Sequence, residues 1–128
     1  MYDFDILVID DDKITLELVQ TILEEVTSGE IYVFSDSKHA LEYVKSASIE
    51  NISLVICDWL MPQVSGLEIL AALRKINSQC PFLMITANAT KQLVVDSMRL
   101  GATDFIVKPF HTHQLLTKVE RLIRDANG

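Results

Sequence analysis

The sequence has only two cysteines, four glycines and three prolines among its 128 residues, and it lacks a long apolar run. No stretch approaches the roughly 20 apolar residues of a membrane-spanning helix. Residues 1–5 contain two Asp and no basic residue, whereas a signal peptide begins with basic residues. Cys57 and Cys80 have neither CxxC spacing nor a nearby His/Cys cluster for a zinc site. We therefore expect a cytoplasmic protein with two reduced, structural cysteines.

Basic residues are also scarce, with 11 Lys and Arg against 18 Asp and Glu, which gives a formal net charge of −7. This balance disfavours binding to nucleic acid or to an anionic membrane, because phosphate surfaces are bound through clustered Lys and Arg. The chain is 49% hydrophobic and 23% charged, which excludes disorder and low complexity. Without a linker or a repeat, residues 1–128 are expected to form one domain.

Short apolar segments alternate with segments of helical spacing five times along the chain. The apolar run 4–9 predicts a buried strand, and the spacing within 13–28 predicts a helix that stops at Gly29. The other predicted strands are 31–34, 52–57, 82–85 and 105–107, and the other predicted helices are 37–47, a helix after Gly66, 90–100 and 111–124. This alternation predicts a doubly wound α/β fold, in which helices cover both faces of a parallel sheet.

Polar side chains follow four of the predicted strands. Asp10 and Asp11 follow the first strand, Asp58 the third, Thr86 the fourth and Lys108 the fifth. Because the carboxyl ends of parallel strands meet at one edge of the sheet, these residues should converge there. Three close carboxylates without Cys or His ligands favour Mg²⁺ or Mn²⁺. Helix capping could explain the acidic residues after the first strand alone, but not a carboxylate at the end of a separate strand.

Several familiar catalytic and nucleotide-binding patterns are absent. The first turn after a strand is acidic and contains neither GxGxxG nor GxxxxGK[ST], so a nucleotide site is not expected. No Ser-His-Asp or Cys-His arrangement for nucleophilic catalysis can be identified in the sequence. His39, His111 and His113 are expected to be surface residues.

These strand-end segments resemble the receiver domain of two-component response regulators over nearly the whole chain. The resemblance rests on residues 6–12, 54–62 with the following Gly66, 85–87 and 101–110. It implies a flavodoxin-like, five-stranded parallel sheet in the order 2-1-3-4-5 with five helices. It also implies a cis peptide bond before Pro109.

The resemblance implies that Asp58 is the phosphoacceptor. It would take a phosphoryl group from a phosphohistidine on a histidine kinase or a histidine phosphotransfer protein. Asp11, Asp58 and the Leu60 backbone carbonyl would hold Mg²⁺ directly, and Asp10 would act mainly through metal-bound water. Such a protein is a signalling switch that assists its own phosphotransfer and dephosphorylation, more than it is an enzyme.

The resemblance also implies how the signal would spread. The Lys108 ammonium would neutralise the phosphoryl charge, and the Thr86 hydroxyl would donate to it, so that Phe105 fills the space that Thr86 leaves. The fourth helix, fifth strand and fifth helix would then dock a downstream output domain or protein, or a second copy of the chain. Leu93 and Val94 are expected to be exposed at this surface, because Val95, Met98 and Ala102 form the face that suits the core.

Four positions depart from the family pattern or are expected to modify it: Ser65, Phe105, Leu60 and Asn88. Ser65 stands where an Asp often precedes the loop glycine and should only retune the helix cap. Phe105 lacks a tyrosine hydroxyl. Leu60 and Asn88, two residues beyond Asp58 and Thr86, are positions that modulate the access of water to the aspartyl phosphate, and apolar Leu60 should slow its hydrolysis.

Three alternatives stay open. The chain could be the N-terminal receiver of a longer regulator or kinase, or a receiver that is never phosphorylated and only scaffolds. A Mg²⁺-dependent phosphohydrolase of similar fold would also use a strand-end Asp as its nucleophile. Such an enzyme usually carries a second Asp two residues later and an inserted cap, whereas this chain has Leu60 and no insertion.

Overall fold

The computed structural model describes residues 2–127 and contains the predicted alternation of strands and helices. The strands are β1 (Asp5–Ile9), β2 (Ile31–Phe34), β3 (Ile52–Asp58), β4 (Phe82–Thr86) and β5 (Asp104–Val107). The helices are α1 (Lys13–Leu23), α2 (Ser37–Val44), α3 (Gly66–Ile76), α4 (Lys91–Arg99) and α5 (Thr112–Asn127), with a short 3-10 helix, η1 (Ala47–Asn51), before β3. The predicted doubly wound α/β fold is confirmed.

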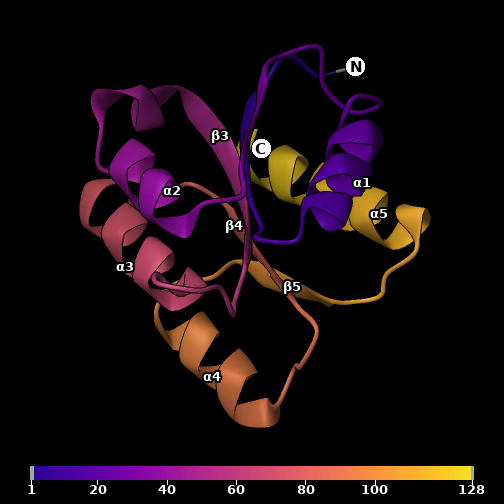
Figure 1. Cartoon of the computed structure of the whole chain (residues 1–128). Helices are drawn as coiled ribbons and strands as arrows, with labels where there is room; N and C mark the ends of the chain where they lie inside the picture. The colour runs from indigo at the N-terminus through magenta and orange to yellow at the C-terminus, as the bar shows by residue number, and fades with distance from the viewer. Residues whose placement is uncertain (1, 128) are drawn as a thin grey trace.

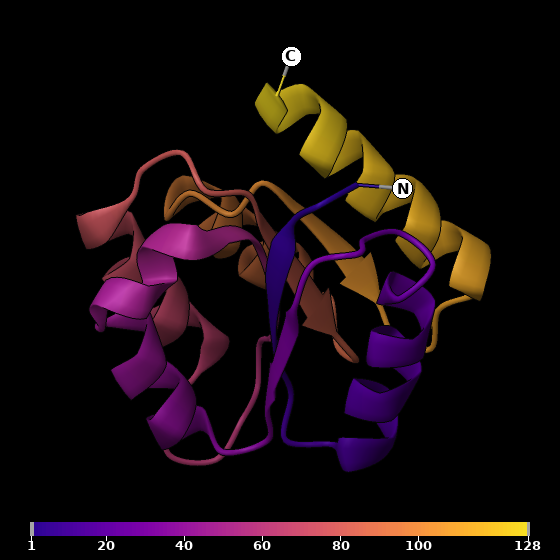
Figure 2. The ribbon, with the colours of Figure 1, turned by 90° about the horizontal axis from the view of Figure 1, so that it is seen from above.

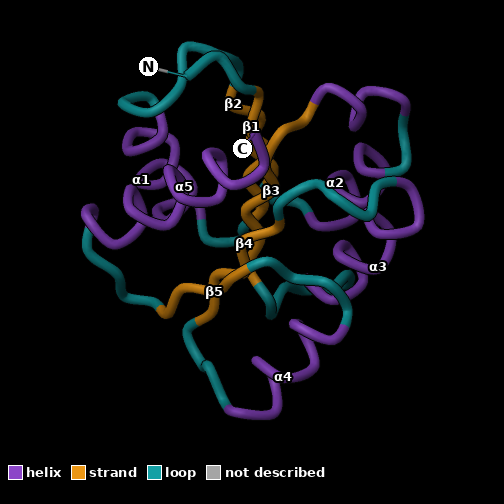
Figure 3. The backbone as a smooth tube through the Cα atoms, turned by 180° about the vertical axis from the view of Figure 1, so that it is seen from behind, coloured by secondary structure: helices purple, strands orange, loops and turns teal. Residues whose placement is uncertain are grey.

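The five strands form one parallel sheet in the order β2-β1-β3-β4-β5. Helices α1 and α5 cover one face, α2 and α3 cover the other, and α4 lies beside β5 on the side of α3 (Figures 1 and 3). The view from above shows the same two layers on either side of the strands (Figure 2). All five carboxyl ends therefore lie at one edge of the sheet, as the site requires.

Alternate side chains of the central strands fill two hydrophobic clusters. In β1, Leu7 and Ile9 point toward α2 and α3, whereas Ile6 and Val8 point toward α1 and α5. This division follows from the two-residue period of a strand that is buried on both faces. No helix among residues 2–127 is long and apolar enough to cross a membrane.

Polar caps start the helices close to the strand ends. Asp12 accepts hydrogen bonds from the Ile14 amide at 3.1 Å and from the Thr15 hydroxyl at 2.8 Å, and these bonds lower the pKa of Asp12. Ser65 forms a capping box with Glu68 at the start of α3, which confirms the expected role of Ser65 in the cap. The turns after β1 and β3 are thereby fixed on either side of the sheet edge.

The first helix is shorter than predicted and ends at Leu23 rather than at residue 28. The following segment leaves the helix because it pairs with the N-terminal segment: the Tyr2 amide donates to Val26 O at 3.0 Å and the Ser28 amide donates to Tyr2 O at 2.7 Å. The Thr27 hydroxyl also bridges to the Phe4 backbone. Helical periodicity cannot reveal these long-range bonds. The second helix is also shorter than predicted: α2 ends at residue 44 rather than at residue 47, and η1 follows.

Helix α4 presents a different face from the one expected. Met98 is 44% exposed, whereas Leu93 and Val94, expected to be exposed, are half-buried. The buried Ser97 replaces Met98 on the inner face, because its hydroxyl bonds back to Val94 O at 2.9 Å and needs no partner from the sheet. The prediction followed the apolar residues and so missed a small polar residue on the inner face.

Candidate functional site

The predicted strand-end residues come together at the carboxyl edge of the sheet. Asp10 follows β1 and Asp58 ends β3, and the pairing of Ile9 with Cys57 places the two carboxylates side by side. Lys108 follows β5, and its amide donates to Thr86 O at 2.8 Å.

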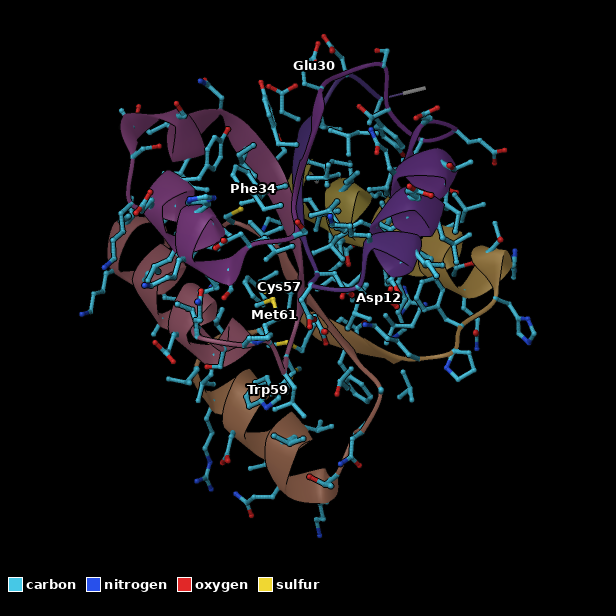
Figure 4. All side chains as sticks on the ribbon, viewed as in Figure 1. Asp12, Glu30, Phe34, Cys57, Trp59 and Met61 are labelled. Atoms are coloured by element: carbon cyan, nitrogen blue, oxygen red, sulfur yellow. The ribbon has the colours of Figure 1, made fainter. Side chains whose placement is uncertain are left out.

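Side chains near this edge lie on both sides of the sheet. Figure 4 shows Asp12 near the start of α1, and Cys57, Trp59 and Met61 on the side of α3 and α4.

Cys57 and Cys80 are buried free thiols, and burial raises the pKa of both, that of Cys80 to about 11. They are structural thiols, as expected.

The acidic cluster contains two buried carboxylates and one exposed carboxylate. Asp10 is 1% exposed and Asp58 is 7% exposed, whereas Asp11 lies at the surface. Each residue offers an oxygen, and these oxygens lie within 4.8 Å of one another. The Lys108 ammonium lies 2.7 Å from Asp10 Oδ2 and 3.4 Å from Asp58 Oδ2. The nearer counter-charge of Lys108 is therefore Asp10 rather than Asp58.

The electrostatics of the cluster favour added positive charge. Burial, followed by the charge of Asp10, raises the pKa of Asp58 to about 6, against the opposing effect of Lys108. Burial alone would lower the pKa of Lys108, but its contacts with Asp10 and Asp58 outweigh burial and raise that pKa. The cluster thus has three carboxyl groups, and the Lys108 ammonium pairs with only two of them, Asp10 and Asp58.

The residues present fit a hard divalent cation. The three candidate side-chain ligands are carboxylates, and carboxylate oxygens suit Mg²⁺ or Mn²⁺. Asp10 Oδ2 is buried and accepts no well-formed hydrogen bond from the described residues, although it is paired in charge with Lys108. A buried oxygen with spare capacity beside an exposed carboxylate is suited to a cation that enters from solvent.

Thr86 provides a hydroxyl beside the cluster. Its Oγ is buried and accepts a hydrogen bond from the Asn88 amide at 3.1 Å. Its proton therefore remains free to donate to an incoming oxygen. Leu60, which is 60% exposed, and Asn88 both lie at the surface, where solvent reaches them.

Gly66 holds the loop after β3 against the site, a role that the sequence did not reveal. A Cβ atom on Gly66 would lie 2.3 Å from Asp58 O and 2.9 Å from Trp59 Cα. The Gly66 amide also donates to Trp59 O at 2.8 Å. The signal in the sequence was a glycine directly before the predicted third helix, because glycine allows a backbone to approach its neighbours closely.

Phe105 and Thr86 line the same small cavity, with a volume of about 10 Å³, beneath α4. Leu93 and Val94 complete its wall on the helix side. The outer side of Phe105 faces Lys118, whose ammonium lies 5.7 Å from the ring centre. The structure thus places the expected switch pair, Thr86 and Phe105, next to Leu93 and Val94 of the expected partner surface. The roles of these four residues stay predictions.

Other sequence expectations also hold. The peptide bond between Lys108 and Pro109 is cis. His39, His111 and His113 are exposed and lie outside the acidic cluster.

Comparison with known proteins gives consistent matches over the whole fold. The chain is 32% identical over 125 residues to the alkaline phosphatase synthesis transcriptional regulatory protein SphR of Synechococcus elongatus, covering 93% of this chain and 48% of that protein. It is 27% identical to the chemotaxis protein CheY of Pseudomonas aeruginosa, covering 96% and 98% of the two chains. The chain therefore spans about half the length of the transcriptional regulator but nearly all of the chemotaxis protein.

Structure and family comparisons agree. The CheY-like response regulator receiver domain protein from Methanospirillum hungatei superposes with a TM-score of 0.88 at 26% identity, covering 98% of this chain and 97% of that chain. The family described as response regulator receiver domain matches residues 6–120. The chain belongs to the response regulator receiver domains, the signalling switches of two-component systems.

Proposed function

We propose that Asp58 accepts a phosphoryl group from a phosphohistidine of a histidine kinase or a histidine phosphotransfer protein. The observation that carries this proposal is a buried carboxylate at a strand end, with Asp10 and Asp11 within 4.8 Å and the Lys108 ammonium at 3.4 Å. The Asp58 oxygen forms a bond to phosphorus as the bond between phosphorus and the histidine nitrogen breaks. Asp58 must be ionised to attack, and a pKa of about 6 leaves it mostly ionised at neutral pH.

Asp11, Asp58 and the Leu60 carbonyl would hold Mg²⁺ directly, and Asp10 would hold it through water. When bound, the ion supplies positive charge to the phosphoryl oxygens. Asp10 has a second task in this proposal, because its 2.7 Å contact with Lys108 holds that ammonium beside the phosphoacceptor. Lys108 then binds a phosphoryl oxygen and offsets the added negative charge.

The switch in this proposal is the pair Thr86 and Phe105. A phosphoryl oxygen on Asp58 would accept the Thr86 proton and draw that side chain toward the site. The cavity of about 10 Å³ leaves Phe105 no room to move inward until Thr86 vacates space. Movement of Phe105 would then change the surface formed by α4, β5 and α5, including Leu93 and Val94, where an output domain, a target protein or a second copy would dock.

The phosphoacceptor is tested by intact-mass spectrometry after incubation with acetyl phosphate and Mg²⁺. We expect one phosphate adduct on the parent and none on Asp58→Ala, whereas the exposed Asp125→Asn on α5 should be labelled like the parent. Omitting Mg²⁺ should abolish the adduct. Labelling that survives the loss of Asp58 would refute the assignment, and the absence of any adduct would favour a receiver that only scaffolds.

A further inference from the structure

Ser37, the first residue of α2, reaches across to the loop that connects β3 to α3. It is only 4% exposed. Its hydroxyl donates to Pro62 O at 2.5 Å and accepts from the Val64 amide at 3.2 Å. One hydroxyl from another element therefore bridges the peptide groups on both sides of Gln63.

The bridged segment is a strained turn. Gln63 has a φ of 72°, in the left-handed region that side-chain-bearing residues rarely adopt. The Val64 amide donates to Pro62 O at 2.8 Å, which closes a three-residue turn around Gln63. Turns of this hand are rare and strained, and they persist where the surroundings hold them. Here the Ser37 hydroxyl contacts both groups that close the turn.

The strained turn lies two residues beyond Leu60. The other anchor of this loop is Gly66, which packs on Asp58 O and donates to Trp59 O. The Leu60 peptide thus lies between a fixed point at β3 and the turn that Ser37 holds. A change in the turn would change the direction of the Leu60 carbonyl.

We propose that Ser37 is a positioning residue that holds this loop so that the Leu60 carbonyl faces the Mg²⁺ site, and that Ser37 thereby sets Mg²⁺ affinity. This inference rests on the proposed function. Capping of α2 does not account for Ser37, because the Asp36 side chain already accepts hydrogen bonds from the Lys38 and His39 amides. The buried hydroxyl instead makes both of its hydrogen bonds, one as donor and one as acceptor, to the loop.

The test compares Ser37→Ala with Thr27→Val. Thr27 is a matched control: its buried hydroxyl also bridges backbone groups, at Phe4 and Gly29, but near the amino ends of the strands. Mg²⁺ affinity is measured by fluorescence of Trp59, the only tryptophan, which directly follows Asp58. Loss of a group that orients a metal ligand typically weakens binding by 10-fold or more, so we expect Ser37→Ala to raise the Mg²⁺ dissociation constant about 10-fold. Thr27→Val should leave it within about twofold of the parent.

A rescue variant separates positioning from a general loss of stability. Glycine adopts positive φ without strain, so Ser37→Ala combined with Gln63→Gly should form the turn without the hydroxyl. We expect this double variant to recover most of the lost Mg²⁺ affinity. At saturating Mg²⁺, Ser37→Ala should be labelled by acetyl phosphate at nearly the parent rate, because no group that contacts the phosphoryl oxygens is changed.

The outcomes distinguish the two proposals. If the parent protein shows no Mg²⁺ response and takes no phosphate, the proposed function fails. If the parent binds Mg²⁺ and Ser37→Ala binds it as tightly as Thr27→Val does, the role of Ser37 is refuted. A Ser37→Ala defect that neither saturating Mg²⁺ nor Gln63→Gly reduces would show that Ser37 only supports the fold, which also overturns the proposal.

Discussion

Asp58→Asn should stabilise the metal-free protein at neutral pH. Asp58 is 7% exposed and lies beside buried Asp10, and these two features raise its pKa to about 6 from an ordinary 3.8. Ionising this carboxylate in the folded protein therefore costs free energy, even with the Lys108 ammonium 3.4 Å away. An amide of the same shape removes the negative charge and keeps an oxygen that can accept from Lys108.

The size and the pH dependence of this effect follow from the pKa of Asp58. Because the folded state holds the Asp58 proton more tightly, the stability contributed by this group is present below about pH 4. It is lost as the pH rises to about 6. The whole shift corresponds to about 3 kcal/mol at about 1.4 kcal/mol for each pH unit. Solvent screens part of the site, so we expect Asp58→Asn to raise the free energy of unfolding by about 1 to 2 kcal/mol at about pH 7.5.

Urea denaturation in the presence of a chelator measures this gain. The parent and Asp58→Asn are compared at about pH 7.5 and about pH 4, with Asp125→Asn as the control for loss of an exposed carboxylate. The gain should shrink to near zero at about pH 4. Mg²⁺ at 100 times its dissociation constant should add about 2.7 kcal/mol to the parent and much less to Asp58→Asn. A variant no more stable than the parent at neutral pH, or a gain that does not depend on pH, would refute the reasoning.

Three further predictions follow from the loop and the acidic cluster. Gly66→Ala places a Cβ atom 2.3 Å from Asp58 O, so it should lower the free energy of unfolding by about 1 to 3 kcal/mol and reduce labelling by acetyl phosphate; unchanged labelling would contradict this. Mg²⁺ affinity, read from Trp59 fluorescence, should fall as the pH is lowered through about 6, because a proton competes for Asp58; a flat profile between about pH 5 and pH 7 would argue against direct ligation by this carboxylate. Leu60→Asn should release phosphate several-fold faster in a time course of intact mass, because a polar side chain replaces an exposed apolar one beside the phosphoacceptor; equal lifetimes would remove Leu60 as a determinant.

The sequence by itself determined the fold class and most of the site. Buried strands appear in the sequence as short apolar runs, and amphipathic helices appear as apolar residues at helical spacing. The alternation of these two patterns predicted the parallel sheet. The parallel sheet in turn predicted that Asp10, Asp58 and Lys108 would meet. These inferences depend on local patterns and on a general rule for the carboxyl ends of strands. The order of the strands was predicted only through the family resemblance, because the spacing of apolar residues does not show which strands are neighbours.

Only the tertiary structure decided the features that depend on contacts between distant segments. It placed Lys108 nearer to Asp10 than to Asp58, turned Ser97 rather than Met98 toward the sheet, and bridged the Gln63 turn with the Ser37 hydroxyl. Each of these outcomes depends on side chains that meet across many residues of sequence. Local spacing specifies which face of an element is apolar, but the partner of a buried polar group is fixed only when the elements pack.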